Sequence, residues 1–217
     1  RLRQVAPRVV VTCARGSSAH AATFAKHLIE RHLGIPVAAA APGIASVYRK
    51  DLRLGGQLVL AISQSGSSDD LIAFVTQARN SNATTVAITN DESSPLARAC
   101  EVVVPLGAGK ELSIPATKTF VATLSALMRV TAAWVGNAAD LDGAIARLPQ
   151  RLKEAMTLDW TGAVDAFTTT ESLVTVGRGP SLAIAREAAL KHKESSNLHA
   201  EAFSSADCEF VQQMSEN

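Results

Sequence analysis

Short runs of apolar, mostly β-branched residues alternate with longer amphipathic segments along the first two-thirds of the chain. The helical patterns are clearest at Ser18–Leu33 and Ser68–Asn80. The apolar runs are Arg8–Thr12, Gly34–Ala38, Gln57–Ser63, Thr84–Thr89 and Glu101–Pro105. Continuous apolar runs are typical of strands covered on both faces. The pattern therefore predicts an α/β fold, a three-layer sandwich with a five-stranded parallel sheet, whose ligands bind at the carboxyl ends of the strands.

The last third of the chain begins with helical patterns and then returns to a strand. Long helices are predicted at Thr117–Val135 and Leu141–Met156, and a shorter one near Trp160–Thr168. A strand follows at Ser172–Val176, and a helix is predicted from Pro180 to Asn197. Proline suits the first turn of a helix because its missing N–H has no partner to lose there.

This later strand repeats the first one. VTVGRGPS (Val174–Ser181) matches VTCARGSS (Val11–Ser18) at five of eight positions, and each residue lies 163 positions after its counterpart. We interpret this as an internal duplication of a strand–helix unit. Fewer than 45 residues follow the strand of the second copy, and one strand cannot form a parallel sheet. We therefore expect a first domain at residues 1–136, a helical connector at 137–170 and an incomplete second copy at 171–217.

Composition limits the classes of partner. The 217 residues are 47% hydrophobic and 19% charged, which allows a packed core and argues against disorder. With 21 basic and 20 acidic residues, the net charge of +1 gives no reason to expect nucleic acid or a membrane surface as partner. The basic cluster Lys26–His32 alternates with apolar residues and is typical of an exposed helix face.

The three cysteines are far apart and form no CxxC pair, which fits a reducing compartment. No apolar run is long enough to span a bilayer. We therefore expect a cytoplasmic protein.

Two loops rich in hydroxyl side chains each join a predicted strand to a helix: ARGSS (Ala14–Ser18) and SQSGSSDD (Ser63–Asp70). Backbone N–H groups, serine hydroxyls and a helix amino terminus together favour an anion, above all phosphate. Neither loop matches a nucleoside-triphosphate or dinucleotide motif. Helix capping is the alternative, but it accounts for one or two hydroxyls and not for four serines within six residues of the second loop.

Charged residues in two predicted helices leave alternatives open. Lys118 lies in the first turn of its helix, where the dipole disfavours a cation, so it either pairs with an anion such as Glu111 or is simply exposed. Glu187, Lys191 and Glu194 fall at i, i+4 and i+7, within roughly 60° of one another on one helix face. Such a group is either an ordinary salt-bridge stripe or an acid–base array.

Four motifs, in this order along the chain, resemble the tandem sugar-isomerase (SIS) domain family. They are GSS after the first strand, SQSG after the third, E-x-x-x-x-ATK, and E-x-A-L-K-x-K-E followed by HAEAFSSA. The resemblance covers Val9 to about Asp207. Its nearest members would be the isomerase half of glucosamine-6-phosphate synthase and the SIS-type glucosamine-6-phosphate deaminases, which share a flavodoxin-like fold.

The resemblance implies a role for individual residues. Glu194 matches the base that moves a proton between C1 and C2 of the opened sugar, and Lys191 and Glu187 match its supporting pair. The residues implied to bind the substrate and its 6-phosphate are Gly16, Ser17, Ser18, Ser63, Gln64, Ser65, Ser68, Ile114 and Ala116. No metal or organic cofactor is implied, and a homodimer is expected. The chemistry agrees, since ketose–aldose interconversion needs one carboxylate for the proton and a cation for the developing enediolate.

One part of the family pattern is missing. After AEAFSSA the family continues with an acidic residue and a His-Gly-Pro, whose histidine opens the sugar ring, whereas here Asp207 precedes CEFVQQMSEN. His199 matches a different family position and does not replace that histidine. We expect an aminotransferase/isomerase or deaminase interconverting fructose-6-phosphate and glucosamine-6-phosphate, in which the activity of this chain itself depends on the missing histidine. The alternative is a non-catalytic, regulatory sugar-phosphate-binding protein.

Overall fold

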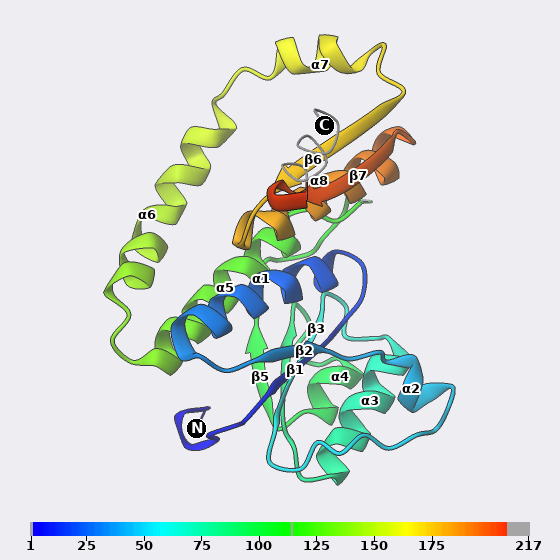
Figure 1. Ribbon diagram of the computed structural model, residues 1–217, viewed down its shortest axis with the longest axis vertical. Coiled ribbons are helices and arrows are strands. Elements are labelled where there is room, and N and C mark those ends of the chain that lie inside the picture. The colour runs from blue at the N-terminus through cyan, green and yellow to red at the C-terminus, as the bar shows by residue number, and fades with distance from the viewer. Residues whose placement is uncertain (1, 114, 208–217) are drawn as a thin grey trace, which may run out of the picture. The chain divides into compact units, whose positions relative to one another are not determined.

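The computed structural model describes residues 2–113 and 115–207 of the chain. It consists of two compact units, Arg1–Val135 and Gly136–Asn217. Figure 1 shows the path of the chain through both.

The first unit is built on a five-stranded parallel sheet with strand order β2-β1-β3-β4-β5. The strands are β1 (Val10–Ala14), β2 (Val37–Ala39), β3 (Leu58–Ser63), β4 (Thr84–Thr89) and β5 (Val102–Pro105). This confirms the predicted α/β fold and its five-stranded parallel sheet. The chain runs from β1 to β2 on one side and then crosses back to β3 on the other side of β1, so the loops after β1 and β3 flank a topological switch point, where ligands of such sheets bind.

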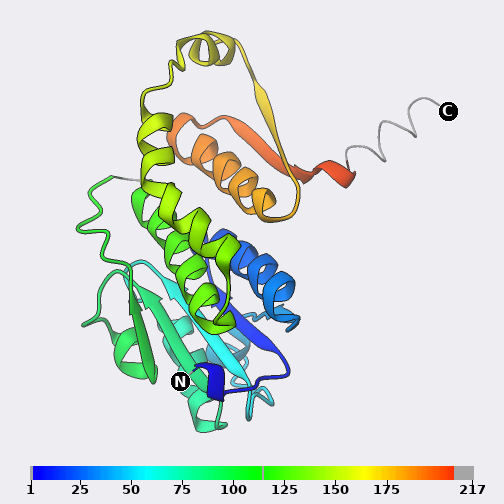
Figure 2. The same ribbon diagram turned by 90° about the vertical axis from the view of Figure 1, so that its left-hand side faces the viewer.

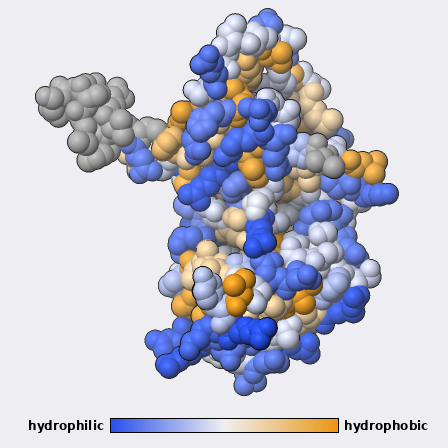
Figure 3. All heavy atoms as spheres, turned by 90° about the vertical axis from the view of Figure 1, so that its right-hand side faces the viewer, coloured by the Kyte–Doolittle hydropathy of each residue, from blue (hydrophilic) through white to orange (hydrophobic). Residues whose placement is uncertain are grey.

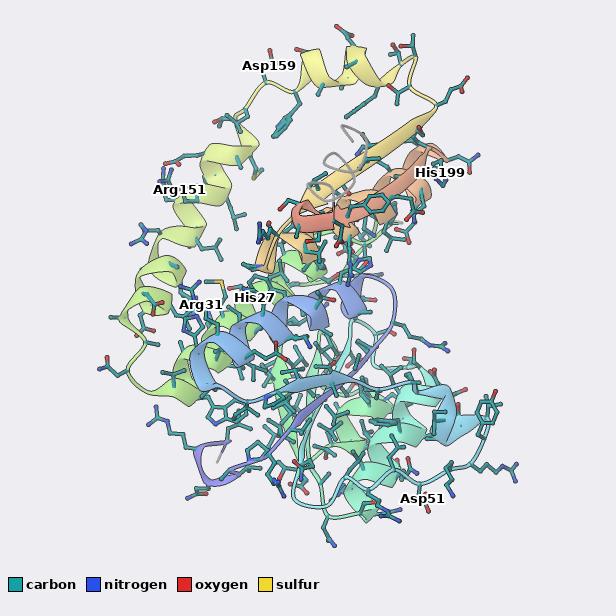
Figure 4. The ribbon with its side chains drawn as sticks, in the orientation of Figure 1. His27, Arg31, Asp51, Arg151, Asp159 and His199 are labelled. Carbon is teal, nitrogen blue, oxygen red and sulfur yellow. The ribbon has the colours of Figure 1, made fainter. Side chains whose placement is uncertain are left out.

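Three long helices of this unit agree with the sequence periodicity to within one residue at each end: α1 (Ser17–Leu33), α3 (Asp69–Asn80) and α5 (Lys118–Val135). The segments η1 (Leu2–Gln4), α2 (Gly43–Ser46) and α4 (Pro95–Ala99) were not expected. They are too short to show a helical period. The basic residues of α1 lie on its exposed side as predicted, and Lys26 pairs with Glu30 at 3.2 Å. His27 and Arg31 of this cluster are labelled in Figure 4.

Helices cover both faces of the sheet. α1 and α5 lie on one face, and α2, α3 and α4 lie on the other, as Figures 1 and 2 show. On the α3 face, alternate strand residues such as Val11, Cys13 and Val59 join one buried cluster with Leu71 and Phe74 of the helix. The intervening strand residues, for example Val10, Leu58 and Leu60, are equally buried. Burial on both faces explains why the central strands read as continuous apolar runs.

The second unit contains α6 (Ala139–Met156), α7 (Thr161–Phe167), β6 (Ser172–Gly177), α8 (Pro180–Ser196) and β7 (His199–Ser204). β6 and β7 pair in parallel over six residues, from Ser172 opposite His199 to Gly177 opposite Ser204. The expectation of a single strand in the second copy was therefore wrong. The sequence does not predict a strand at HAEAFS, because the segment has no β-branched residue and only weak strand propensity.

A two-residue link joins α8 to β7. Asn197 ends the helix in the left-handed conformation, with φ of 52°, and Leu198 leads directly into the strand. One face of the β6–β7 pair packs against α8, and Ala200 is buried there. The opposite face carries Val174, Val176 and Phe203, each about half exposed.

The face drawn in Figure 3 carries hydrophilic and apolar side chains side by side. Most of the exposed large apolar residues belong to the second unit, among them Met156, Trp160 and Val164. Within residues 2–113 and 115–207, no helix is both long and apolar enough to cross a membrane.

Candidate functional site

The turn after β1 carries the first serine pair. Gly16 has φ of 52° and ψ of −134°, a conformation that is easy only for glycine, and it lets the chain turn from β1 directly into α1. Ser17 and Ser18 are the first two residues of α1 and are half-buried. Among the described residues, neither hydroxyl has a hydrogen-bond partner, and the first turn of α1 has no acidic side chain. These groups are therefore placed to accept an anion from outside the chain.

The second copy repeats this turn. Gly179 precedes α8 with φ of 58° and ψ of −130°, within a few degrees of Gly16. The serine hydroxyl of this second turn, however, is already used within the turn. Ser181 Oγ accepts a hydrogen bond from the Arg178 N–H at 2.9 Å and donates one to the Arg178 carbonyl at 2.8 Å. The agreement in backbone geometry supports the duplication inferred from the sequence.

The loop after β3 is held by its own first serine. Ser63 Oγ accepts a hydrogen bond from the Gly66 N–H at 3.1 Å, and Ser63 is buried. Gly66 has φ of 62°, and a Cβ there would lie 2.2 Å from Ser94 Oγ, so only glycine fits. Ser68 stands at the N-cap position of α3, yet its side chain makes no capping hydrogen bond. Capping therefore does not explain the serines of this loop.

The segment before α5 forms a third loop. Glu111 Oε2 accepts hydrogen bonds from Thr119 N at 3.1 Å and from Thr119 Oγ1 at 3.0 Å. Burial alone would raise the pKa of Glu111, but these two hydrogen bonds and the nearby Lys118 outweigh it and lower that pKa. Lys118 itself is exposed and donates to the Lys110 carbonyl at 2.6 Å. Ile114 lies outside the described residues.

Two residues tie the three loops to one another. Arg15 Nη2 lies 2.8 Å from Asp70 Oδ2, which links the turn after β1 to the end of the β3 loop. Asn90 donates its backbone N–H to the Gln64 carbonyl at 3.1 Å. The Asn90 side chain also donates to the Gly109 carbonyl at 2.7 Å and accepts from the Ala108 N–H at 2.9 Å. The loops are thus mutually braced before any ligand binds.

A pocket of about 160 Å³ opens where these segments meet. Its lining residues are Arg15, Ser17, Ser18, Ala21, Gln64, Ala116, Thr119, Phe120 and Thr123. Four of the expected substrate-binding residues line it: Ser17, Ser18, Gln64 and Ala116. Ser63, Ser65 and Ser68 belong to the adjoining loop but do not line this pocket.

Besides Ala21 of α1, sequence reasoning missed Arg15, Thr119, Phe120 and Thr123 as lining residues. The recurrence of Arg15 as Arg178 in the repeat was a usable signal for the first of them. The other three lie on α5 at i, i+1 and i+4, a spacing that sequence alone assigns to the core.

In the second unit, Glu187, Lys191 and Glu194 of α8 are brought together as predicted. Lys191 Nζ lies 3.3 Å from Glu187 Oε1 and 2.7 Å from Glu194 Oε2. The side chains are 8%, 18% and 41% exposed for Glu187, Lys191 and Glu194. Lys191 therefore bridges one buried and one accessible carboxylate. A buried carboxylate such as that of Glu187 requires a cation of this kind nearby.

Two further observations concern His199 and metal binding. His199 is exposed on β7 (Figure 4), on the face opposite to the buried Ala200. Over the described part of the chain, no three His, Cys, Asp or Glu side chains are placed to hold a metal ion.

Comparison with known proteins agrees with this geometry. The SIS domain family model matches residues 5–133, more than half of the chain and nearly all of the first unit. The chain belongs to the SIS domain family. Its relatives include two proteins named glutamine–fructose-6-phosphate aminotransferase. The one from Halobacterium salinarum is 34% identical over 95% of this chain, and that from Symbiobacterium thermophilum is 33% identical over 92%.

Solved structures of this family share the fold. A protein from Silicibacter pomeroyi, classed as a phosphosugar isomerase, superimposes with a TM-score of 0.91 at 45% identity and covers 95% of this chain. The C-terminal domain of glucosamine-fructose-6-phosphate aminotransferase from Francisella tularensis has a TM-score of 0.78 at 27% identity. The SIS chain spans 63% and 61% of these two structures, and about a third of the two aminotransferases.

Proposed function

We propose that this protein binds a phosphorylated sugar and interconverts fructose-6-phosphate and glucosamine-6-phosphate by amination or deamination coupled to isomerisation. The observation that carries the proposal is the pocket of the first unit, because residues from all three expected substrate-binding segments line it. The names of the most similar relatives supply the choice of sugar phosphates. Self-association as a homodimer stays a prediction.

Phosphate binding is assigned to the serine loops. The Ser17 and Ser18 hydroxyls have no partner among the described residues, and Ser68 does not cap α3, so these hydroxyls remain available as donors. Backbone N–H groups at the start of α1 add positive potential. The hydrogen bond from Gly66 to Ser63 fixes the backbone of the second loop in advance, which lowers the entropy lost on binding.

Proton transfer is assigned to Glu194. In the ketose-to-aldose direction its carboxylate takes a proton from C1, the electrons of that C–H bond form the C1–C2 double bond, and the π electrons of the C2 carbonyl move to O2, which gives an enediolate. A proton passes from O1 to O2, the C1 carbonyl forms, and the carboxylate returns its proton to C2. The Lys191 ammonium, 2.7 Å from Glu194, stabilises negative charge that develops during the transfer. Glu187 holds Lys191 from the buried side. Glu194 is the more accessible carboxylate of the two, as a base that contacts substrate must be.

Replacing Ser68 by alanine tests the phosphate loop. We expect Ser68→Ala to weaken fructose-6-phosphate binding, measured by calorimetry, by about tenfold, the value of one hydrogen bond to a charged group. Ser67→Ala is the matched control, because that hydroxyl already donates to the Ser65 carbonyl. A Ser68→Ala protein that binds the ligand as tightly as the parent would rule out this assignment.

Replacing Glu194 by glutamine tests the reaction. In the natural full-length protein, we expect Glu194→Gln to lower the rate of isomerisation by about a hundredfold or more, as loss of a general base does. The control is Glu201→Gln, a carboxylate on β7 that is 53% exposed and pairs only loosely with Lys193 at 3.9 Å. If Glu194→Gln changed the isomerisation rate by less than a few-fold, Glu194 would be a surface charge and not the base. If the protein bound sugar phosphate tightly without turnover, the alternative function, a non-catalytic sugar-phosphate-binding protein, would hold.

A further inference from the structure

Of the described residues that line the pocket of the first unit, Arg15 is the one that carries a charge. Two of the polar lining groups are already used inside the protein: Thr119 Oγ1 donates to Glu111, and Thr123 Oγ1 donates to the Thr119 carbonyl at 2.7 Å. The lining groups left to meet a ligand are the Arg15 guanidinium, the two serine hydroxyls and the Gln64 amide. Of these, only Arg15 carries a full positive charge.

The ion pair with Asp70 orients Arg15 without saturating it. Arg15 Nη2 lies 2.8 Å from Asp70 Oδ2, yet Oδ2 has no hydrogen-bond partner in the part of the chain that the structure describes. The contact is therefore a charge pair in which the N–H bonds of the guanidinium do not point at that oxygen. A guanidinium has five N–H donors, and this contact commits few of them.

Burial is also unequal across the pair. The Arg15 side chain is 66% exposed, whereas that of Asp70 is 12% exposed. Asp70 is thus fixed in the protein at the start of α3, and the cation is the partner that faces solvent and the pocket. A buried carboxylate behind an accessible guanidinium keeps the cation at the pocket while leaving its N–H donors for an incoming anion.

We propose that Arg15 is a further ligand-binding residue of this pocket, and that its guanidinium donates hydrogen bonds to the phosphate group of the bound sugar while Asp70 holds it in place. The proposal rests on the proposed function, since it concerns the same ligand. It differs in giving the ligand's negative charge a cationic partner in the chain, where the serine loops supply only neutral donors.

The experiment compares Arg15→Gln with Arg53→Gln by calorimetry. Arg53 is exposed, lies in the same unit and does not line the pocket, so its replacement changes net charge equally. Both proteins are titrated with fructose-6-phosphate and with inorganic phosphate. We expect Arg15→Gln to weaken both ligands by about tenfold or more, as charge-assisted hydrogen bonds require, and to flatten the salt dependence of binding. Arg53→Gln should bind within twofold of the parent.

A third variant distinguishes ligand binding by Arg15 from a purely structural role in linking the two loops. Asp70→Asn keeps Arg15 but removes the charge pair that links the two loops. If Arg15 served only to brace them, Asp70→Asn and Arg15→Gln would weaken the ligand equally and lower the melting temperature equally, and the proposal would be overturned. We expect Asp70→Asn to cost less than threefold in affinity, and Arg15→Lys to recover part of the affinity that Arg15→Gln loses.

The outcomes also distinguish the two proposals. If the parent binds inorganic phosphate but not fructose-6-phosphate, and Arg15→Gln loses the phosphate, the sugar assignment fails and the role of Arg15 stands. If the parent binds fructose-6-phosphate and Arg15→Gln binds it equally well, the role of Arg15 fails alone. A parent that binds neither ligand overturns both.

Discussion

The chain passes from strand to helix through an Arg-Gly turn twice, at residues 15–18 and at residues 178–181. The two glycines have φ of 52° and 58° and nearly equal ψ, so the backbones match. The side chains do not. In the first turn both serine hydroxyls are without a partner among the described residues, whereas in the second Pro180 replaces one serine and Ser181 bonds to Arg178. The first turn keeps hydroxyls for the ligand proposed above, whereas its copy uses its hydroxyl to stabilise the turn.

This comparison shows which part of a repeated motif carries fold and which carries function. Gly16 and Gly179 serve the fold, because both are required by the same backbone conformation. Ser17 and its counterpart Pro180 differ in a way that leaves the backbone unchanged, since both occupy the first helical position. Chemistry can therefore be read from the residues in which the copies disagree.

The largest expected difference between the copies concerns the strand residue two positions before each turn. Cys13 ends the buried part of β1, and its counterpart in β6 is the exposed Val176. Burial, with the nearby charge of Asp70, raises the pKa of Cys13 from its ordinary 9.0 to about 12. Since the thiolate is the reactive form, we expect iodoacetamide to label native Cys13 at pH 8 about a thousandfold more slowly than the unfolded chain.

Peptide mass spectrometry measures this labelling, and Cys100, with its pKa raised to about 11, is an internal standard. Because the folded pKa of Cys13 is raised, its contribution to stability is complete below pH 9 and is lost as the pH rises toward 12. Equal labelling rates in the native and unfolded chains would show that the first unit does not protect β1.

Gly16→Ala tests whether the turn needs glycine. A Cβ at residue 16 would meet no heavy atom within 4 Å, so any loss reflects backbone strain alone. We expect a loss of roughly 2 kcal/mol in the free energy of unfolding, followed in urea by the fluorescence of the buried Trp134. Gly43→Ala is the control, because it has equal space without a positive φ. If both variants unfold at the parent's urea concentration, the shared conformation carries no constraint.

Ser17→Pro converts the first turn toward the second. Proline is tolerated at the first helical position, and Gly179 already precedes a proline in the same conformation. We expect an unchanged melting temperature and about tenfold weaker fructose-6-phosphate binding, because a hydroxyl and an N–H donor are both removed. Ser17→Ala separates the two donors. Undiminished binding by Ser17→Pro would show that this residue does not contact the ligand.

The smallest effects come from the matched serines. Ser181→Ala removes two hydrogen bonds with Arg178 and should lower stability by about 1 kcal/mol without affecting the ligand. Ser18→Ala removes none among the described residues and should weaken the ligand while stability stays within about 0.5 kcal/mol. Urea unfolding and calorimetry on both proteins give the four values. The reverse pattern would exchange the roles assigned to the two turns.

Much of the fold could be predicted because burial leaves a simple pattern. β3 and β4 are covered on both faces and read as uninterrupted apolar runs, and the predicted bounds of β4 are those observed. The strand β7 was not predicted, because it lacks such a pattern. Its exposed residues alternate with more buried ones, its one fully buried residue is Ala200, and its pairing partner β6 precedes it by a whole helix, α8.

The candidate site was only partly accessible from the sequence. Ser17, Ser18, Gln64 and Ala116 line the pocket as expected, because they follow strands whose carboxyl ends meet at one edge of the sheet. Asn90 and the pair of Arg15 with Asp70 could not be predicted in the same way. Their partners lie 18 to 55 positions away in sequence, and one-dimensional spacing does not show which loops touch.

The two-residue link between α8 and β7 restricts how this part of the protein can change during evolution. A substitution in α8 alters one side chain, but an inserted residue would turn everything beyond it by about 100° around the helix axis. It would thereby separate Glu187 from Lys191 and Glu194 if it fell between them. With only Asn197 and Leu198 to absorb the extra length, the insertion would also shift β7 by one residue against β6 and exchange its two faces. We expect insertions and deletions to be much rarer in this helix than substitutions, because each would shift the strand pairing and those between Glu187 and Glu194 would also separate the charged group.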